Sequence, residues 1–283
     1  MKRDFPTAPQ PSQAATTPGS LESEAAAPVA PKSAEAVCKL AVVSHDYNRA
    51  GPSVLPGYAD HLHQINRLCD DEGCDTVLYA LWTWDNRSAV PKDHDSLFGG
   101  LRAVQRIVIE SANLSASTDF VEELWVRGSQ RPVLMYQRFA ASTDPESKMR
   151  QFLADLSTRA VADAVVMLCG ETNIASLVRS TGQMRDRGFN ERLNEMGVRV
   201  VLNPVHTCMT TRMIVKRRHY SQDGRTVVSV WNQGRGRGES VLPWMVFHDG
   251  KQRTDAVREL ARPFKDRPDI RVGVLSLPPA GDN

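Results

Sequence analysis

The stretch that decides the fold is "DAVVMLCGETNIAS", residues 163–176, in which an apolar run leads directly to a cysteine. The run is short and rich in β-favouring residues, which predicts a buried strand ending at Cys169. A glycine, Glu171 and the possible first turn of a helix follow. Active sites of open α/β sheets collect where strands end and helices begin. Cys169 is therefore either a nucleophile at such a corner or a small apolar residue of the core.

The sequence on both sides alternates between strand-like and helix-like patterns. We expect strands at residues 37–45, 74–84, 163–169, 198–206, 225–234 and 271–277. We expect helices at residues 57–73, 96–114, 174–197 and 209–224. Residues 122–139 and 240–253 each read as two strands joined by a turn. Strands and helices in alternation, with hairpins among them, predict an α/β protein with a mixed sheet and helices outside.

Composition divides the chain into two parts. Residues 1–36 are mostly Pro, Ala, Ser and Thr with almost no large apolar side chains, which predicts a disordered tail. No linker is evident after residue 37, so residues 37–283 are expected to form a single domain.

Charge and hydropathy exclude several classes of protein. Lys and Arg number 35 against 33 Asp and Glu, so no broad attraction to nucleic acid or anionic membranes is expected. No apolar run approaches the ~18 residues that a membrane span needs. The N-terminus lacks the apolar stretch of a secretory signal, so we expect a cytoplasmic protein with free thiols. Cys69 and Cys74, in "CDDEGC", are only a weak zinc signal, and no metal or cofactor is expected.

The order of these segments resembles the nitrilase (carbon–nitrogen hydrolase) superfamily over roughly residues 38–250. "VVMLCGETN" (165–173) is similar to its nucleophile segment, and "VLNPVH" (201–206) to the strand that follows. "GRTVVSVWNQG" (224–234) and the Asp-Gly hairpin resemble its later strands. The resemblance implies an α-β-β-α sandwich with mixed sheets. It also implies a homodimer and an amide or nitrile substrate.

The resemblance also implies a mechanism. In this superfamily a cysteine attacks a nitrile or amide carbon, a glutamate acts as general base, and a lysine stabilises the charged intermediate. Cys169 matches the cysteine, and Glu171 has a supporting position. Leu81 stands where the glutamate is expected, and within "YQRF" (136–139) the nearest cation is Arg138, not lysine. Arg138 is therefore predicted to hold the oxyanion, in a divergent member.

The general base is left without an assignment. Asp85, just beyond the missing glutamate, is the leading candidate. Glu110 at the end of a predicted helix, and His45 and Asp46 at the end of the first strand, are alternatives. His206, at the end of the strand after that of Cys169, can act as a base in a Cys/His arrangement.

Three functions remain open from the sequence. The first is hydrolysis of a non-peptide carbon–nitrogen bond through Cys169. The second is a catalytically inactive binding or accessory protein, which the absent glutamate and lysine favour. The third and weakest is association with nucleic acid through "GRGRG" (234–238) and "KRRH" (216–219), which predicts binding that falls steeply with salt.

Overall fold

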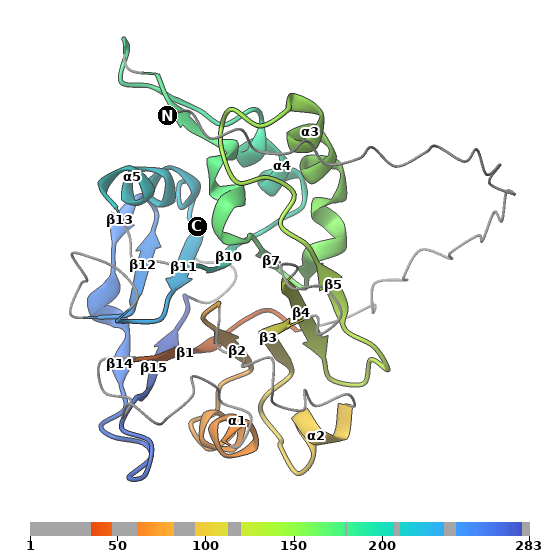
Figure 1. The fold of residues 1–283 in the computed structure, drawn as a ribbon, viewed down its shortest axis with the longest axis vertical. Coiled ribbons are helices and arrows are strands. Elements are labelled where there is room, and N and C mark those ends of the chain that lie inside the picture. The colour runs from red at the N-terminus through yellow and green to blue at the C-terminus, as the bar shows by residue number, and fades with distance from the viewer. Residues whose placement is uncertain are drawn as a thin grey trace, which may run out of the picture. The chain divides into compact units, whose positions relative to one another are not determined.

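The computed structural model describes residues 35–46, 61–81, 94–112, 120–178, 180–206, 210–234 and 242–278 (Figure 1). The tail predicted at residues 1–36 falls almost entirely outside these ranges, as does Asp85.

The first large sheet carries the N-terminal half and the last strand of the chain. Within the described residues its strands run in the order β14-β15-β1-β2-β3-β4-β5. Strands β1, β2 and β3 are parallel, and antiparallel strands flank them on both sides. The bounds are β1 Lys39–His45, β2 Thr76–Tyr79, β3 Arg106–Ala112, β4 Phe120–Val126, β5 Val133–Met135, β14 Arg258–Glu259 and β15 Ile270–Ser276.

The second large sheet repeats this plan with the order β13-β12-β11-β10-β7-β6 among the described residues. Strands β7, β10 and β11 are parallel, and β12 and β6 are antiparallel to their neighbours. The bounds are β6 Ala160–Val161, β7 Ala164–Val166, β10 Val200–Pro204, β11 Thr226–Val230, β12 Trp244–His248 and β13 Lys251–Gln252. A separate hairpin pairs β8 (Ser176–Leu177) with β9 (Met184–Arg185).

Helices cover the outer face of each sheet (Figure 1). Apolar residues of α1 (Leu62–Asp71) and α2 (His94–Phe98) pack with those of β1–β3. Apolar residues of α3 (Glu146–Asp155), α4 (Phe189–Glu195) and α5 (Thr211–Tyr220) pack with those of β7, β10 and β11. Three short 3₁₀ helices complete the described elements, η1 Leu156–Arg159, η2 Cys169–Ile174 and η3 Thr254–Ala256. The α-β-β-α sandwich expected from the sequence is confirmed.

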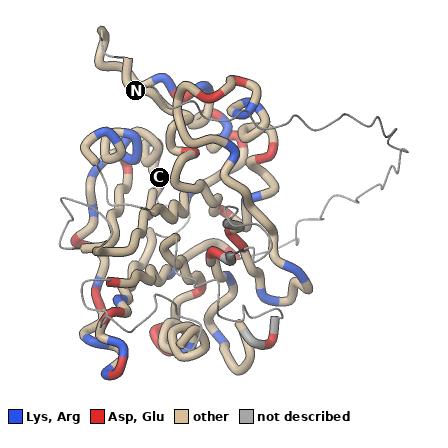
Figure 2. Tube along the Cα trace, in the orientation of Figure 1, with Lys and Arg blue, Asp and Glu red and all other residues tan. Residues whose placement is uncertain are grey.

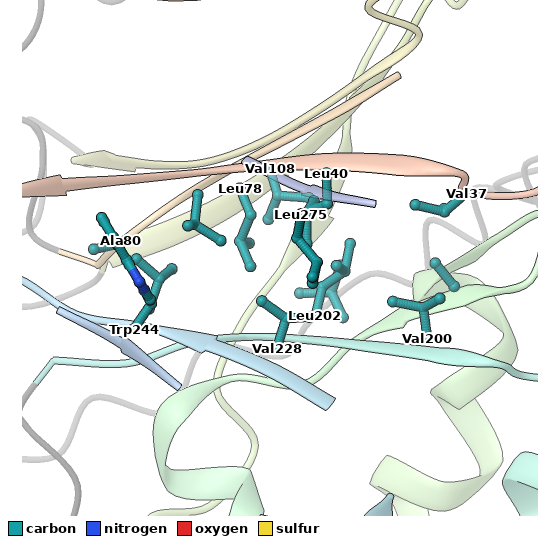
Figure 3. Close-up of a cluster of buried hydrophobic side chains, with 14 of the residues drawn as sticks. Val37, Leu40, Leu78, Ala80, Val108, Val200, Leu202, Val228, Trp244 and Leu275 are labelled. Carbon is teal, nitrogen blue, oxygen red and sulfur yellow. The ribbon is translucent and has the colours of Figure 1, made fainter. Parts of the chain in front are cut away.

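The two sheets meet through an apolar layer (Figure 3). Leu78 and Val108 of the first sheet and Leu202 and Val228 of the second are fully buried in it. Alternate residues of each strand point to opposite faces, so their neighbours face the helices instead. This two-residue alternation fixes which side chains at the strand ends point into the space between the sheets.

The helix expected at residues 96–114 is wrong beyond Phe98. Helix α2 ends at Phe98, and residues 106–112 form strand β3. Gly100 has φ +75°, which a helix cannot contain, and the β-branched run that follows it favours a strand. Glu110 consequently lies on a strand of the first sheet.

The helix expected at residues 174–197 is largely wrong. Its first half contains the β8–β9 hairpin, whose turn is closed by N–H groups of Thr181 and Gly182 donating to the Val178 carbonyl. Only α4 remains helical, and a turn at Asp186–Gly188 precedes it. The expected strands, the helices around α1 and α5, and the Asp249–Gly250 hairpin are confirmed where described.

Asn232, just beyond β11, joins the two sheets at the carboxyl ends of their parallel strands. Its side chain donates to the Leu81 carbonyl at 2.7 Å and accepts from the His45 N–H at 2.8 Å. None of the described helices is long and apolar enough to cross a membrane.

Candidate active site

Cys169 lies where β7 gives way to the short helix η2. It is partly exposed, unlike the fully buried Cys69 and Cys74. Tyr220 of α5 holds η2 in place, because its hydroxyl donates to the Thr172 carbonyl at 2.6 Å and accepts from the Ala175 N–H. The cysteine therefore stands at an ordered corner next to the helix α5.

His206 is next to Cys169 because β7 and β10 are parallel neighbours. Val166 pairs with Leu202, so continuing both strands brings residue 206 to the cysteine. His206 and Cys169 both line the same pocket, and the two residues interact electrostatically. Burial alone would raise the pKa of Cys169, but stabilisation of the thiolate by the side chain and backbone N–H of His206, with the charge of Arg217, brings that pKa below its usual value.

Glu110 approaches His206 from the opposite sheet. Its Oε1 lies 3.5 Å from Nε2 of His206, and the carboxylate is 2% exposed. Val108 and Glu110 share a strand face, so the carboxylate points into the space between the sheets. Burial lowers the pKa of His206, but hydrogen bonds to Cys169 and Glu110 outweigh this and raise it to about 9. Cys169, His206 and Glu110 thus form a chain suited to a thiolate–imidazolium pair.

A second carboxyl group, Glu122, lies directly opposite Glu110 in the β3–β4 ladder. Both of its side-chain oxygens are buried, and neither has a hydrogen-bond partner among the described residues. Burial, and then the charges of Glu110 and Glu123, raise the pKa of Glu122 well above its usual range. These effects favour the neutral form of Glu122, and Glu110 is the carboxylate beside His206.

Arg217 of α5 supplies a buried positive charge on the other side of the cysteine. It is fully buried, and its guanidinium donates to Oδ1 of Asn203 at 2.7 and 3.1 Å. No Asp or Glu of the described residues pairs with it, and its charge helps to lower the pKa of Cys169. The orientation of Asn203 is fixed because its side-chain Nδ2 donates to the Met167 carbonyl. A thiolate at Cys169 is the natural counter-charge for this arginine.

Gln137 covers the turn that follows the cysteine. Its Oε1 accepts the Gly170 N–H at 2.8 Å, which fixes the amide so that its Nε2 is available to donate. A Cβ on Gly170 would lie 2.6 Å from this Nε2 and 2.7 Å from the Phe139 carbonyl oxygen. Glycine is therefore required at residue 170 for residues 137–140 to lie against the turn.

These residues open into a pocket of about 720 Å³. Cys169, His206 and Gln137 line it, as do Lys216 and Arg212 of α5. The rest of the wall is formed by small, hydroxyl and apolar side chains, namely Ala140, Ser142, Gly170, Thr172, Asn173, Ser176, Leu177, Met184, Thr210, Thr211, Met213 and Val215. The cavity can hold a small organic molecule with its reacting atom at the sulfur.

Two residues predicted for the site lie behind the pocket wall rather than in it. Glu171 is fully buried, pairs with Arg159 at 2.6 Å, and accepts N–H groups of Leu168 and Arg138 at 2.9 Å. The guanidinium of Arg138 binds Asp155 at 3.0 Å, and Arg138 is not among the lining residues. The oxyanion role of Arg138 stays a prediction without a supporting contact, and Glu171 has the contacts of a structural carboxylate.

The other described candidates for the base do not line the pocket of Cys169. Leu81, at the position of the expected glutamate, is buried, and the structure does not describe Asp85. His45 pairs with Asp269 at 2.8 Å, and Asp46 bridges to Gln233. Neither lines the pocket. Of the described candidates, His206 and Glu110 are the two that the fold brings together with Cys169.

Sequence reasoning missed Gln137, Arg217 and Lys216. Gln137 belongs to "YQRF", the segment in which Arg138 was predicted to replace the lysine because it is the nearest cation. Lys216 and Arg217 belong to "KRRH", whose charges the helix dipole already explains. Among the described residues no group of three or more His, Cys, Asp or Glu side chains is arranged to hold a metal ion.

No family model matches the sequence, and none of the curated proteins matches it. Two solved structures are similar in fold. One is a carbon–nitrogen hydrolase from Helicobacter pylori G27, with a TM-score of 0.45, 9% identity, and coverage of 85% of this chain and 89% of that one. The other is a mutant of a Nesterenkonia AN1 amidase from the nitrilase superfamily, with a TM-score of 0.46, 12% identity, and coverage of 89% and 94%. Both come from the superfamily that the sequence resembles. Likeness of this degree concerns the fold alone, so the chemistry must follow from the residues.

Proposed function

We propose that this protein is a hydrolase that cleaves a non-peptide carbon–nitrogen bond, with Cys169 as nucleophile, His206 as general acid and base, and Glu110 as the group that orients His206. The observation that carries the proposal is the position of His206, which lines the same pocket as Cys169 and lies 3.5 Å from Glu110. A base held between a nucleophile and a carboxylate is the arrangement that activates a thiol.

The reaction begins when the thiolate of Cys169 attacks the carbonyl carbon of an amide. A sulfur–carbon bond forms, and the charge that develops on the carbonyl oxygen needs a donor. The C–N bond then breaks, and the imidazolium of His206 gives its proton to the departing nitrogen. Neutral His206 next takes a proton from water, whose oxygen attacks the thioester. The carboxylic acid leaves and the thiolate is restored.

The site also explains how the chain can do without the glutamate and lysine of the superfamily. His206 with Glu110 replaces the base, and Arg217 with the imidazolium supplies the positive charge near the sulfur. An inactive binding protein, the alternative left open by the sequence, would not need this pairing. The homodimer implied by the resemblance stays a prediction.

Cys169 is expected to become acylated when the protein meets an activated acyl donor such as p-nitrophenyl acetate. Mass mapping of peptides after short incubation locates the adduct, and release of ammonia from a panel of aliphatic amides measures turnover. Cys169→Ala should lose both signals, whereas Cys38→Ala, which removes an exposed thiol, should keep them. Acylation elsewhere, or none, would favour the inactive protein.

Gln137→Ala is expected to lower the acylation rate about 10²-fold, because the side-chain amide of Gln137 is the donor best placed for the oxyanion. Alkylation of Cys169 by iodoacetamide develops no oxyanion and should change less than about threefold. The two rates, measured on the same preparation, separate oxyanion binding from loss of thiolate. Equal losses in both reactions would show that Gln137 only positions the turn.

A further inference from the structure

The wall of the Cys169 pocket carries two positively charged side chains of α5. Arg212 and Lys216 are four residues apart on α5, so they lie on the same face of the helix, and both line the pocket. Figure 2 shows Lys and Arg following one another along this helix. None of the described residues that line the pocket is an Asp or Glu.

Lys216 has no carboxylate partner in the described part of the chain. Its Nζ donates to Oδ1 of Asn173, whose Nδ2 is bound to the Ala140 carbonyl. Burial, and then the charges of Arg217, Arg187 and Arg212, lower the pKa of Lys216 to about 8. Arg187 is already paired with Glu146, so it does not compete for the pocket. Positive charges held together in a half-buried wall repel one another until an anion joins them.

We infer that the pocket selects substrates whose acyl part carries a carboxylate, which Lys216 and Arg212 bind while the amide carbon lies at Cys169. The inference rests on the proposed function, because it names the substrate class of the same site. Hydroxyl groups of Ser142, Ser176 and Thr211 in the wall can complete the hydrogen bonds of the carboxylate. Apolar side chains such as Met213 and Leu177 suit the carbon chain between the two groups.

Two alkylating reagents of similar size test this inference, anionic iodoacetate and neutral iodoacetamide. The ratio of the iodoacetate rate to the iodoacetamide rate at Cys169 does not depend on the thiolate fraction, because both reagents react with the same thiolate. Dividing it by the same ratio at exposed Cys38 removes the intrinsic difference between the reagents, so the result reports attraction of the carboxylate to the pocket. Lys216→Gln, which can still donate to Asn173, should lower this ratio about fivefold, and Arg212→Gln should lower it by a similar or smaller factor. Lys148→Gln and Arg150→Gln, on the exposed side of α3, are matched controls that should leave it unchanged.

The outcomes separate the two proposals. An unchanged ratio in both α5 variants, with iodoacetamide still labelling Cys169, overturns the carboxylate site and leaves the hydrolase intact. No labelling of native Cys169 by iodoacetamide contradicts the hydrolase. Calorimetric titration with glutarate then tests the carboxylate site independently. Binding to the wild type and the Lys148→Gln control but not to Lys216→Gln supports the site. Equal binding to all three proteins, or no binding to any of them, overturns it.

Discussion

His206→Gln should slow alkylation of Cys169 by iodoacetamide at pH 6 by about 10²-fold, the largest effect on alkylation expected for a variant that keeps the cysteine. Glutamine preserves a polar side chain but cannot carry the charge that holds the thiolate. Only the charge of Arg217 then opposes the effect of burial, so the pKa of Cys169 should rise toward or beyond its usual value. The loss of thiolate at pH 6 is only partly offset by the greater nucleophilicity of a more basic thiol.

The pH dependence follows from the same pair. The pKa of Cys169 is lowered, so its alkylation should persist below the free-thiol pKa of ~8.5. The pKa of His206 is about 9, so the imidazolium that protonates the departing nitrogen is lost as pH rises through that value. Alkylation should therefore stay high above pH 9, whereas amide turnover should fall. The two apparent pKa values belong to the coupled pair rather than to either residue alone.

A matched control is available in His219, which pairs with Asp186 at 3.0 Å outside the pocket. His219→Gln removes an equivalent His–Asp contact and should leave the alkylation profile of Cys169 unchanged. If His206→Gln and His219→Gln behave alike, the profile reflects general stability, and the role of His206 as base is wrong.

The corner at Cys169 and its neighbour His206 could both be found from sequence, because each ends an apolar run and parallel strands end at the same edge of a sheet. Which candidate base meets the cysteine could not be found, because that depends on how two sheets face each other across the core. Glu110 is an example. Its assignment to a helix did not predict which way its side chain points, whereas on β3 it shares a face with Val108 and points toward β10.

The roles of charged residues were harder to predict than the strands. Glu171 follows the cysteine directly, which suggests chemistry, but its contacts with Arg159 and two backbone N–H groups become visible only in three dimensions. The spacing of Arg212 and Lys216 on one helix face was present in the sequence. The role of this face could not be predicted from the sequence, because only the fold shows that it lines the pocket of Cys169.

Glu171→Ala should lower the free energy of unfolding by about 3–5 kcal/mol, the largest effect on stability among the variants considered. The change leaves the buried guanidinium of Arg159 without its partner carboxylate, and it leaves the N–H groups of Leu168 and Arg138 without an acceptor. Urea unfolding measures the difference. The exposed pair Arg192–Glu195, 2.9 Å apart, is the control, and Glu195→Ala should cost less than about 1 kcal/mol.

Replacing both partners distinguishes a structural carboxylate from a catalytic one. Glu171→Met combined with Arg159→Met removes the charges together, so much of the stability lost in Glu171→Ala should return. If Glu171 only holds the corner, alkylation of Cys169 in the stable double variant should recover as well, because Leu168 still leads into the same turn. A stable double variant in which Cys169 is acylated by p-nitrophenyl acetate as slowly as in Glu171→Ala would instead place Glu171 in the chemistry, beside His206 and Glu110.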